Sequence, residues 1–76
     1  MVADSRLRVG YYQTEEDALM LVTNLKKQEV LGAEIVLERE AGVVVDAYDG
    51  SVIASNCKSF SIDLGKFGHR VLEIKY

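Results

Sequence analysis

The chain contains no proline among its 76 residues, so the residue that most strongly interrupts helices and strands is absent throughout. Glycines and Asp-Gly pairs are then the main signals for turns. The clearest of these is Asp49-Gly50, a pair that tight hairpins favour because glycine adopts positive φ at little cost. Glycine positions therefore guide the division of this chain into elements.

A chain of 76 residues is long enough for one hydrophobic core, so we expect a single domain over residues 1–76. Apolar residues make up 49% of it and charged residues 28%, which is typical of a folded domain. The single cysteine, Cys57, cannot form an internal disulfide, and this fits a reducing compartment. One cysteine also excludes a cysteine-rich zinc site.

Charge and hydropathy exclude two classes of partner. The net charge is −3 and the basic residues are scattered, which does not favour binding to nucleic acid. No apolar run approaches the roughly 20 residues that a membrane-spanning helix requires. We therefore expect a soluble cytoplasmic protein with no membrane or nucleic-acid partner, and with no metal or cofactor.

Alternation of apolar and polar residues predicts strands at both ends of the chain. One covers residues 6–12, where Leu7, Val9 and Tyr11 alternate with polar or small residues, and the other covers residues 69–76. Residues 33–38 and 43–45 suggest a hairpin around Ala41-Gly42. After Asp49-Gly50, a further strand is expected at residues 52–54.

Residues 15–31 have the features of a helix. Thr14 and Asp17 have the spacing of a capping box, and acidic residues follow Thr14 where a helix N-terminus is partially positive. Apolar residues then recur with helical spacing from Ala18 to Leu25, and Gly32 offers a left-handed cap. These signals predict a helix that ends at Gly32.

Residues 55–64 allow two interpretations. Cys57, Phe60 and Leu64 have helical spacing after Ser55, which is a possible N-cap. The same segment also alternates as a strand would, with Phe60, Ile62 and Leu64 on one side. Periodicity alone leaves helix and strand open.

Cys57 and His69 are the residues with the greatest chemical potential. A helix N-terminus before Cys57 would activate its thiol, and His69, the only histidine, would be its base in a small thiol-dependent enzyme or redox protein. Twelve positions separate the two without a flanking signature, and a free cysteine is more often a packing residue. We therefore expect no catalytic activity and keep the thiol enzyme as an alternative.

The second half of the chain resembles the HPr (histidine-containing phosphocarrier) family. The resemblance rests on the stretch from Val52 to Gly65, with Ser61-Ile62-Asp63-Leu64 similar to the exit of that family's second helix. It implies an α+β fold, an HPr-like open-faced sandwich with β-α-β-β-α-β order and an antiparallel sheet with helices on one face. It also implies that residues 55–64 form a helix.

The family's phosphoryl-accepting histidine should precede the first helix, but that loop here is Tyr12-Gln13-Thr14. The resemblance therefore implies a degenerate, non-catalytic member that acts as a regulatory or partner-binding module. Its protein partner would bind at the N-termini of both helices, on Tyr12, Gln13, Thr14, Ser55 and Asn56. The family's regulatory phosphorylation site would correspond to Ser55 or, less directly, to Ser59.

Two other roles remain as alternatives. The stretch from Val9 to Ala18 is similar to the opening of a sporulation-related repeat domain, which binds glycan strands, but the second half does not repeat it. An unpaired edge strand would allow a self-assembling structural domain and a homo-oligomer.

Overall fold

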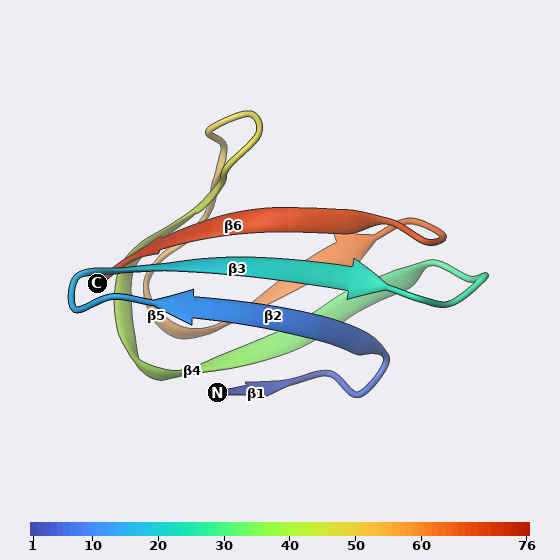
Figure 1. The fold of residues 1–76 in the computed structure, drawn as a ribbon, viewed down its shortest axis with the longest axis horizontal. Helices are drawn as coiled ribbons and strands as arrows, with labels where there is room; N and C mark the ends of the chain where they lie inside the picture. The colour runs from blue at the N-terminus through green and yellow to red at the C-terminus, as the bar shows by residue number, and fades with distance from the viewer.

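The computed structural model describes all 76 residues and contains six antiparallel β-strands and no helix (Figure 1). The strands are β1 (Val2–Ala3), β2 (Leu7–Gln13), β3 (Asp17–Asn24), β4 (Val30–Asp46), β5 (Val52–Leu64) and β6 (His69–Lys75). Their order across the sheet is β1-β4-β6-β3-β2, and β5 also pairs with β4. The expected α+β class is therefore wrong, and the HPr-like fold is wrong with it.

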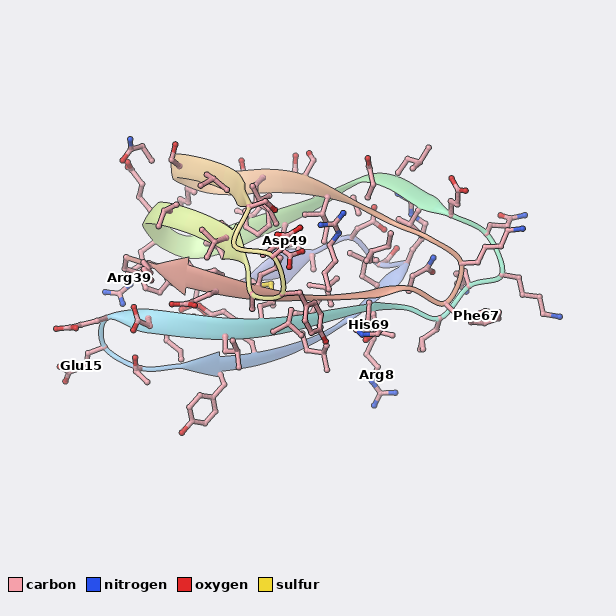
Figure 2. All side chains as sticks on the ribbon, turned by 90° about the horizontal axis from the view of Figure 1, so that it is seen from above. Arg8, Glu15, Arg39, Asp49, Phe67 and His69 are labelled. Atoms are coloured by element: carbon pink, nitrogen blue, oxygen red, sulfur yellow. The ribbon has the colours of Figure 1, made fainter.

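The two longest strands, β4 and β5, run through both layers of the molecule. The first half of β4 pairs with β1 and with the second half of β5. The second half of β4 pairs with β6 and with the first half of β5. Figure 2 shows β2 and β3 in the lower layer and parts of β4 and β5 in the upper one. The sheet thus folds over itself into a barrel-like sandwich.

A large bulge makes the bend in β4. Val36 lies opposite Ser59, and Ala41 lies opposite Cys57, so four residues of β4 face a single residue of β5 between these pairs. Extra residues on one strand of a pair bend it and increase its twist. Gly42 follows the bulge, and a Cβ at this position would lie 3.2 Å from the carbonyl oxygen of Lys75. A glycine here lets β4 approach the end of β6 closely.

One cluster of buried apolar side chains fills the space between the layers. Its largest fully buried members are Met20, Ile35, Leu37, Leu72 and Ile74. They come from β3, β4 and β6, so the core joins segments far apart in the sequence. Burial of such side chains is the main stabilising contribution in a domain of this size.

The segment predicted as a helix over residues 15–31 forms part of the β2–β3 turn, strand β3, the β3–β4 turn and the first two residues of β4. Ala18, Met20 and Val22 are buried, whereas Leu19 and Leu21 are exposed. Apolar residues occupy both sides of β3, so the alternation is masked and the apolar spacing also fits a helix. The segment forms a strand because β3 pairs with β2 on one side and with β6 on the other.

Thr14 and Gly32, which mark the two ends of the predicted helix, have other roles in the structure. The hydroxyl of Thr14 accepts a hydrogen bond from the Asp17 amide, but the Thr14 amide also donates to the Asp17 carbonyl and closes a two-residue hairpin turn. Gly32 has the expected left-handed conformation, with φ of 63°, at a register shift in β4. There its amide donates to Asp63 Oδ1 at 2.7 Å.

Residues 55–64 belong to β5, so the strand interpretation is correct and the helix implied by the family resemblance is wrong. Phe60, Ile62 and Leu64 are buried and alternate with exposed residues. The predicted hairpin at Ala41-Gly42 is also wrong, because β4 continues through both residues.

Several predictions from alternation are confirmed. The strand expected at residues 6–12 is β2, and the one expected at residues 69–76 is β6. Asp49-Gly50 lies in the turn between β4 and β5, and Gly50 has φ of 74°. The strand expected at residues 52–54 is the start of β5.

Candidate interaction surface

The outward side of the five strands β2, β3, β6, β4 and β5 carries apolar side chains. We call this set the apolar face: Tyr12, Leu19, Leu21, Val45, Val52 and Val71. Tyr12 is 73% exposed and Val52 64%, and the two leucines are close to half exposed. The solvent side of an antiparallel sheet is ordinarily polar, so a continuous apolar face marks a surface suited to contact.

The strand register places these residues in two neighbouring rows. One row runs Tyr12, Leu19, Glu73, Val45 and Val52, each residue paired with the next across the sheet. In the next row, Leu21 lies between Gly10 and Val71. Cross-strand neighbours lie about 5 Å apart, so Tyr12, Leu19, Leu21 and Val71 form one continuous patch on β2, β3 and β6. Glu73 separates this patch from Val45 and Val52 in the same row.

Gly10 leaves a hollow in the apolar face. The hollow has a volume of about 310 Å³, and its lining includes Tyr12, Leu19, Leu21 and Val71. A Cβ at Gly10 would make only ordinary contacts, the nearest with Leu21 at 3.9 Å. The glycine is thus not required by the packing of the chain itself, and it creates space on the surface next to the protruding Tyr12.

The two ends of the outward side carry opposite charge. Arg8, Thr23 and His69 form the row at one end, and Figure 2 shows Arg8 pointing away from the sheet there. Glu15 and Glu16 form the turn at the other end, next to Asp17, and with these three acidic residues against the one cation of that row, Lys75, the end is negative in net charge. Neither Arg8 nor the two turn glutamates form an ion pair within the chain. These charges are available to a partner.

The residues predicted to bind a partner occupy two separate places. Gln13 and Thr14 lie at the end of β2 and in the following turn, and Tyr12 belongs to the apolar face. Ser55 and Asn56 lie in β5. The predicted face at two helix N-termini is wrong, because the structure has no helix.

The pairing of the strands gives the separation between Thr14 and Ser55. Thr14 is level with Asp17, Asp17 pairs with Lys75, and Val43 pairs with both Lys75 and Ser55. Three strands therefore separate Thr14 from Ser55, which corresponds to about 19 Å across the sheet. The two groups lie at the same end of the sheet and at opposite edges.

Both predicted phosphorylation sites are exposed. Ser55 pairs with Val43, and Ser59 pairs with Val36 at the bend. Neither lies at the start of a helix, the position that the family resemblance implies for the regulatory serine. Asn56 adopts φ of 48° next to the bend in β4. Phosphorylation of either serine stays a prediction.

Cys57 and His69 lie far apart. Cys57 pairs with Ala41 beyond the C-terminal end of β6, is half-buried and packs against the core. His69 begins β6 and makes an edge-to-face contact with Tyr48, whose ring centroid is 6.1 Å away. The length of β6, about 20 Å, separates the two residues. The structure does not bring them together as a thiol–imidazole pair.

The end of the barrel near the β2–β3 turn holds a cluster of aromatic and basic groups. The hydroxyls of Tyr11 and Tyr76 share a hydrogen bond, and the Arg39 guanidinium lies 3.9 Å from the centre of the Tyr76 ring. Burial raises the pKa of Tyr11 above its usual value of 10.0, and the hydrogen bond with Tyr76 acts in the same direction. Arg39 also donates to the Glu15 carbonyl oxygen. The cluster anchors the C-terminal residue and the β2–β3 turn.

A polar hollow lies beside His69, with a volume of about 360 Å³. Its lining includes Asp46, Asp49, Asp63 and Arg70, and Figure 2 shows Asp49 and His69 from above. Each carboxylate is already engaged: Asp46 with Arg70, Asp49 with the Ser51 amide and Asp63 with the Gly32 amide. No group of three or more His, Cys, Asp or Glu residues is arranged to hold a metal ion.

Sequence reasoning missed most of the apolar face. The predicted helix includes Leu19 and Leu21, whereas Val45 and Val71 fall in predicted strands, with Val71 on the polar side of the last one, and neither is predicted to bind a partner. The available signal is the unbroken apolar run from Ala18 to Val22, which leaves a strand no polar side. Tyr12 is the one residue of the predicted site that belongs to the face.

Comparison with known proteins identifies the fold only. No family model and no curated protein matches the chain. The chain is similar to part of Gan42B, a GH42 beta-galactosidase from G. stearothermophilus, with a TM-score of 0.65 and 23% sequence identity. A catalytic mutant of the same enzyme matches with a TM-score of 0.64 and 23% identity. Each match covers 99% of this chain and 9% of the solved chain.

Both solved structures are those of a GH42 beta-galactosidase, and neither is described as an HPr protein. No helix in the structure is long and apolar enough to cross a membrane.

Proposed function

We propose that this chain is a non-catalytic protein-interaction module that docks through the apolar face. The observation that carries the proposal is the exposure of Tyr12, Leu19 and Leu21 on the neighbouring strands β2 and β3, around the hollow at Gly10. Soluble monomers seldom expose contiguous apolar patches beyond a few hundred Å², and larger ones mark contact sites. A protein partner would bury these side chains and release the water that covers them.

The anatomy of the surface supports this role. Fully buried centres of protein interfaces are rich in aromatic and aliphatic residues, and their rims are polar. Here Tyr12 and the leucines lie between a row with Arg8 and His69 and a row with Thr14 and Asp17. Tyrosine and arginine are also the residue types that most often dominate binding energy.

The fold similarity is compatible with a module of this kind. In the GH42 beta-galactosidase, the matched segment is 9% of the chain, so the fold occurs there as a small part of a much larger protein. A small β-domain in that setting must contact its surroundings through a surface. We propose that the apolar face is the surface through which this chain contacts its partner, and we do not extend the enzyme's activity to this chain.

Site-specific photo-crosslinking tests the proposal. A photoreactive phenylalanine analogue replaces Tyr12 in one variant and Phe67 in the control. Both aromatics are exposed, at 73% and 61%, but Phe67 lies at the far end of the molecule, in the β5–β6 turn (Figure 2). In living cells of the native source, we expect a protein adduct at position 12 that is missing at position 67. Identical adduct patterns at both positions would contradict the proposal.

A further inference from the structure

We infer, on the basis of the proposed interaction role, that the partner of the apolar face is a second copy of this chain, stacked face to face by two-fold symmetry. The face carries a protruding aromatic ring, a hollow beside it and two ends of opposite net charge. These features are arranged so that one copy complements another.

The protrusion and the hollow are neighbours on one strand. Tyr12 is 73% exposed, and the hollow at Gly10 lies two residues before it on the same side of β2. A two-fold axis in the plane between the copies, running across the strands, reverses the strand direction of the second copy. If it passes over Tyr11, it places Tyr12 of each copy above Gly10 of the other. Each ring then enters the partner's hollow.

The same operation pairs the apolar residues of β3. Tyr11 is level with Met20 in the strand register, so the axis also passes over Met20. It therefore places Leu19 of one copy above Leu21 of the other. Isologous contacts of this kind occur twice in one interface, so every favourable contact is doubled.

Charge supports the same orientation. The axis places Arg8 of one copy above Thr14 of the other, beside the turn formed by Glu15 and Glu16. Arg8 and both glutamates lack an ion-pair partner within the chain. Parallel stacking would instead bring like charges together, which is unfavourable.

The size of the face predicts a reversible dimer. Five strands and six residue steps span about 19 Å by 20 Å, so the contact buries at most roughly 400 Å² on each copy, because the barrel-like sheet curves away from a facing copy. A standard interface buries about 800 Å² on each partner, so this contact belongs to the weak end of the range. We therefore expect dissociation at micromolar concentrations.

Sedimentation equilibrium of the full chain tests the inference. The wild type is measured from about 1 μM to about 1 mM, beside Gly10→Val and Tyr12→Ala. Valine at position 10 fills the hollow, and the adjacent packing tolerates a Cβ there. Circular dichroism and thermal unfolding verify that each variant is folded. We expect a wild-type dimer and at least a tenfold weaker association in both variants.

Charge reversal tests the orientation. Arg8→Glu should weaken association, and the same change combined with Glu15→Arg and Glu16→Arg should restore it. Lys58→Glu, an equal charge change in β5 outside the apolar face, should have no effect. Restoration requires that the two ends meet in the dimer.

A wild-type chain that stays monomeric up to about 1 mM would overturn the inference. So would a Gly10→Val variant that associates as the wild type does. If the chain is monomeric but Tyr12 crosslinks to a different protein, the interaction role stands and only the identity of the partner is wrong. If neither self-association nor crosslinking occurs, both are wrong.

Discussion

The Arg70 guanidinium lies 3.2 Å from the Asp46 carboxylate, measured from Nη1 to Oδ2, and joins the start of β6 to the end of β4. Asp46 is only 6% exposed. Its other oxygen, Oδ1, accepts a hydrogen bond from the Tyr48 amide at 2.8 Å. A single buried carboxylate thus fixes the β4–β5 turn and its neighbouring strand.

Replacing Asp46 should destabilise the domain strongly. We expect Asp46→Ala to lower the free energy of unfolding by about 2 kcal/mol, because Nη1 of Arg70 and the Tyr48 amide lose their acceptor. Asp46→Asn retains one acceptor oxygen and should cost less. Urea unfolding of the three proteins measures both differences. Equal stability of wild type and Asp46→Ala would show that the ion pair contributes nothing.

Asn24 joins two turns at the end of the barrel. Its side chain is fully buried, donates to the carbonyl oxygens of Gln28 and Gly65, and accepts from the Lys26 amide. We expect Asn24→Ala to lower the free energy of unfolding by about 2 kcal/mol, because three backbone groups of the two turns lose the buried side chain that joins them. The neighbouring change Thr23→Ala, on the outward side of the same strand, is the control and should cost less than half as much.

Alkaline pH should destabilise the protein through Tyr11. Burial, with the Tyr76 hydrogen bond, raises the pKa of Tyr11 above 10.0, so the folded chain retains a proton that the unfolded chain releases near pH 10. Stability from this group is complete below about pH 10 and is lost as the pH rises through the folded-state pKa. Tyr11→Phe should therefore reduce the loss of stability between pH 9 and 11, to be measured by thermal unfolding. An unchanged slope would contradict this assignment.

Gly32 should be harder to replace than Gly65. Gly32 has φ of 63°, which strains any residue with a Cβ, whereas Gly65 lies in open space without a positive φ. We expect Gly32→Ala to cost about 1 kcal/mol and Gly65→Ala to be close to neutral or stabilising. Urea unfolding of both variants and the wild type measures the two changes in the free energy of unfolding. Equal destabilisation by Gly65→Ala and Gly32→Ala would refute the conformational explanation.

Alternation predicted the strands whose two sides differ in polarity. In β2, polar or small residues separate Leu7, Val9 and Tyr11, and the strand was placed to within one residue. The same was true of β6. In β3, the outward side is itself apolar because it belongs to the candidate interface, and Leu19 and Leu21 removed the alternation. The surface feature that suggests a function also misled the assignment of structure.

The long strands could not be recognised from local patterns. The bulge in β4 changes which residues face the core, and three register shifts interrupt its pairing with β5. Ala41-Gly42 has the composition of a turn, but Gly42 is small because the Lys75 backbone passes close to it. That requirement comes from a strand more than thirty positions away. A single sequence does not reveal it.

Because β4 and β5 each belong to both layers, neither layer can detach while the other stays intact. Amide protons of Ile35 in one layer and Val44 in the other are therefore expected to exchange with solvent through the same rare opening of the whole domain. The short β1, which pairs at only two positions, is the part free to exchange independently.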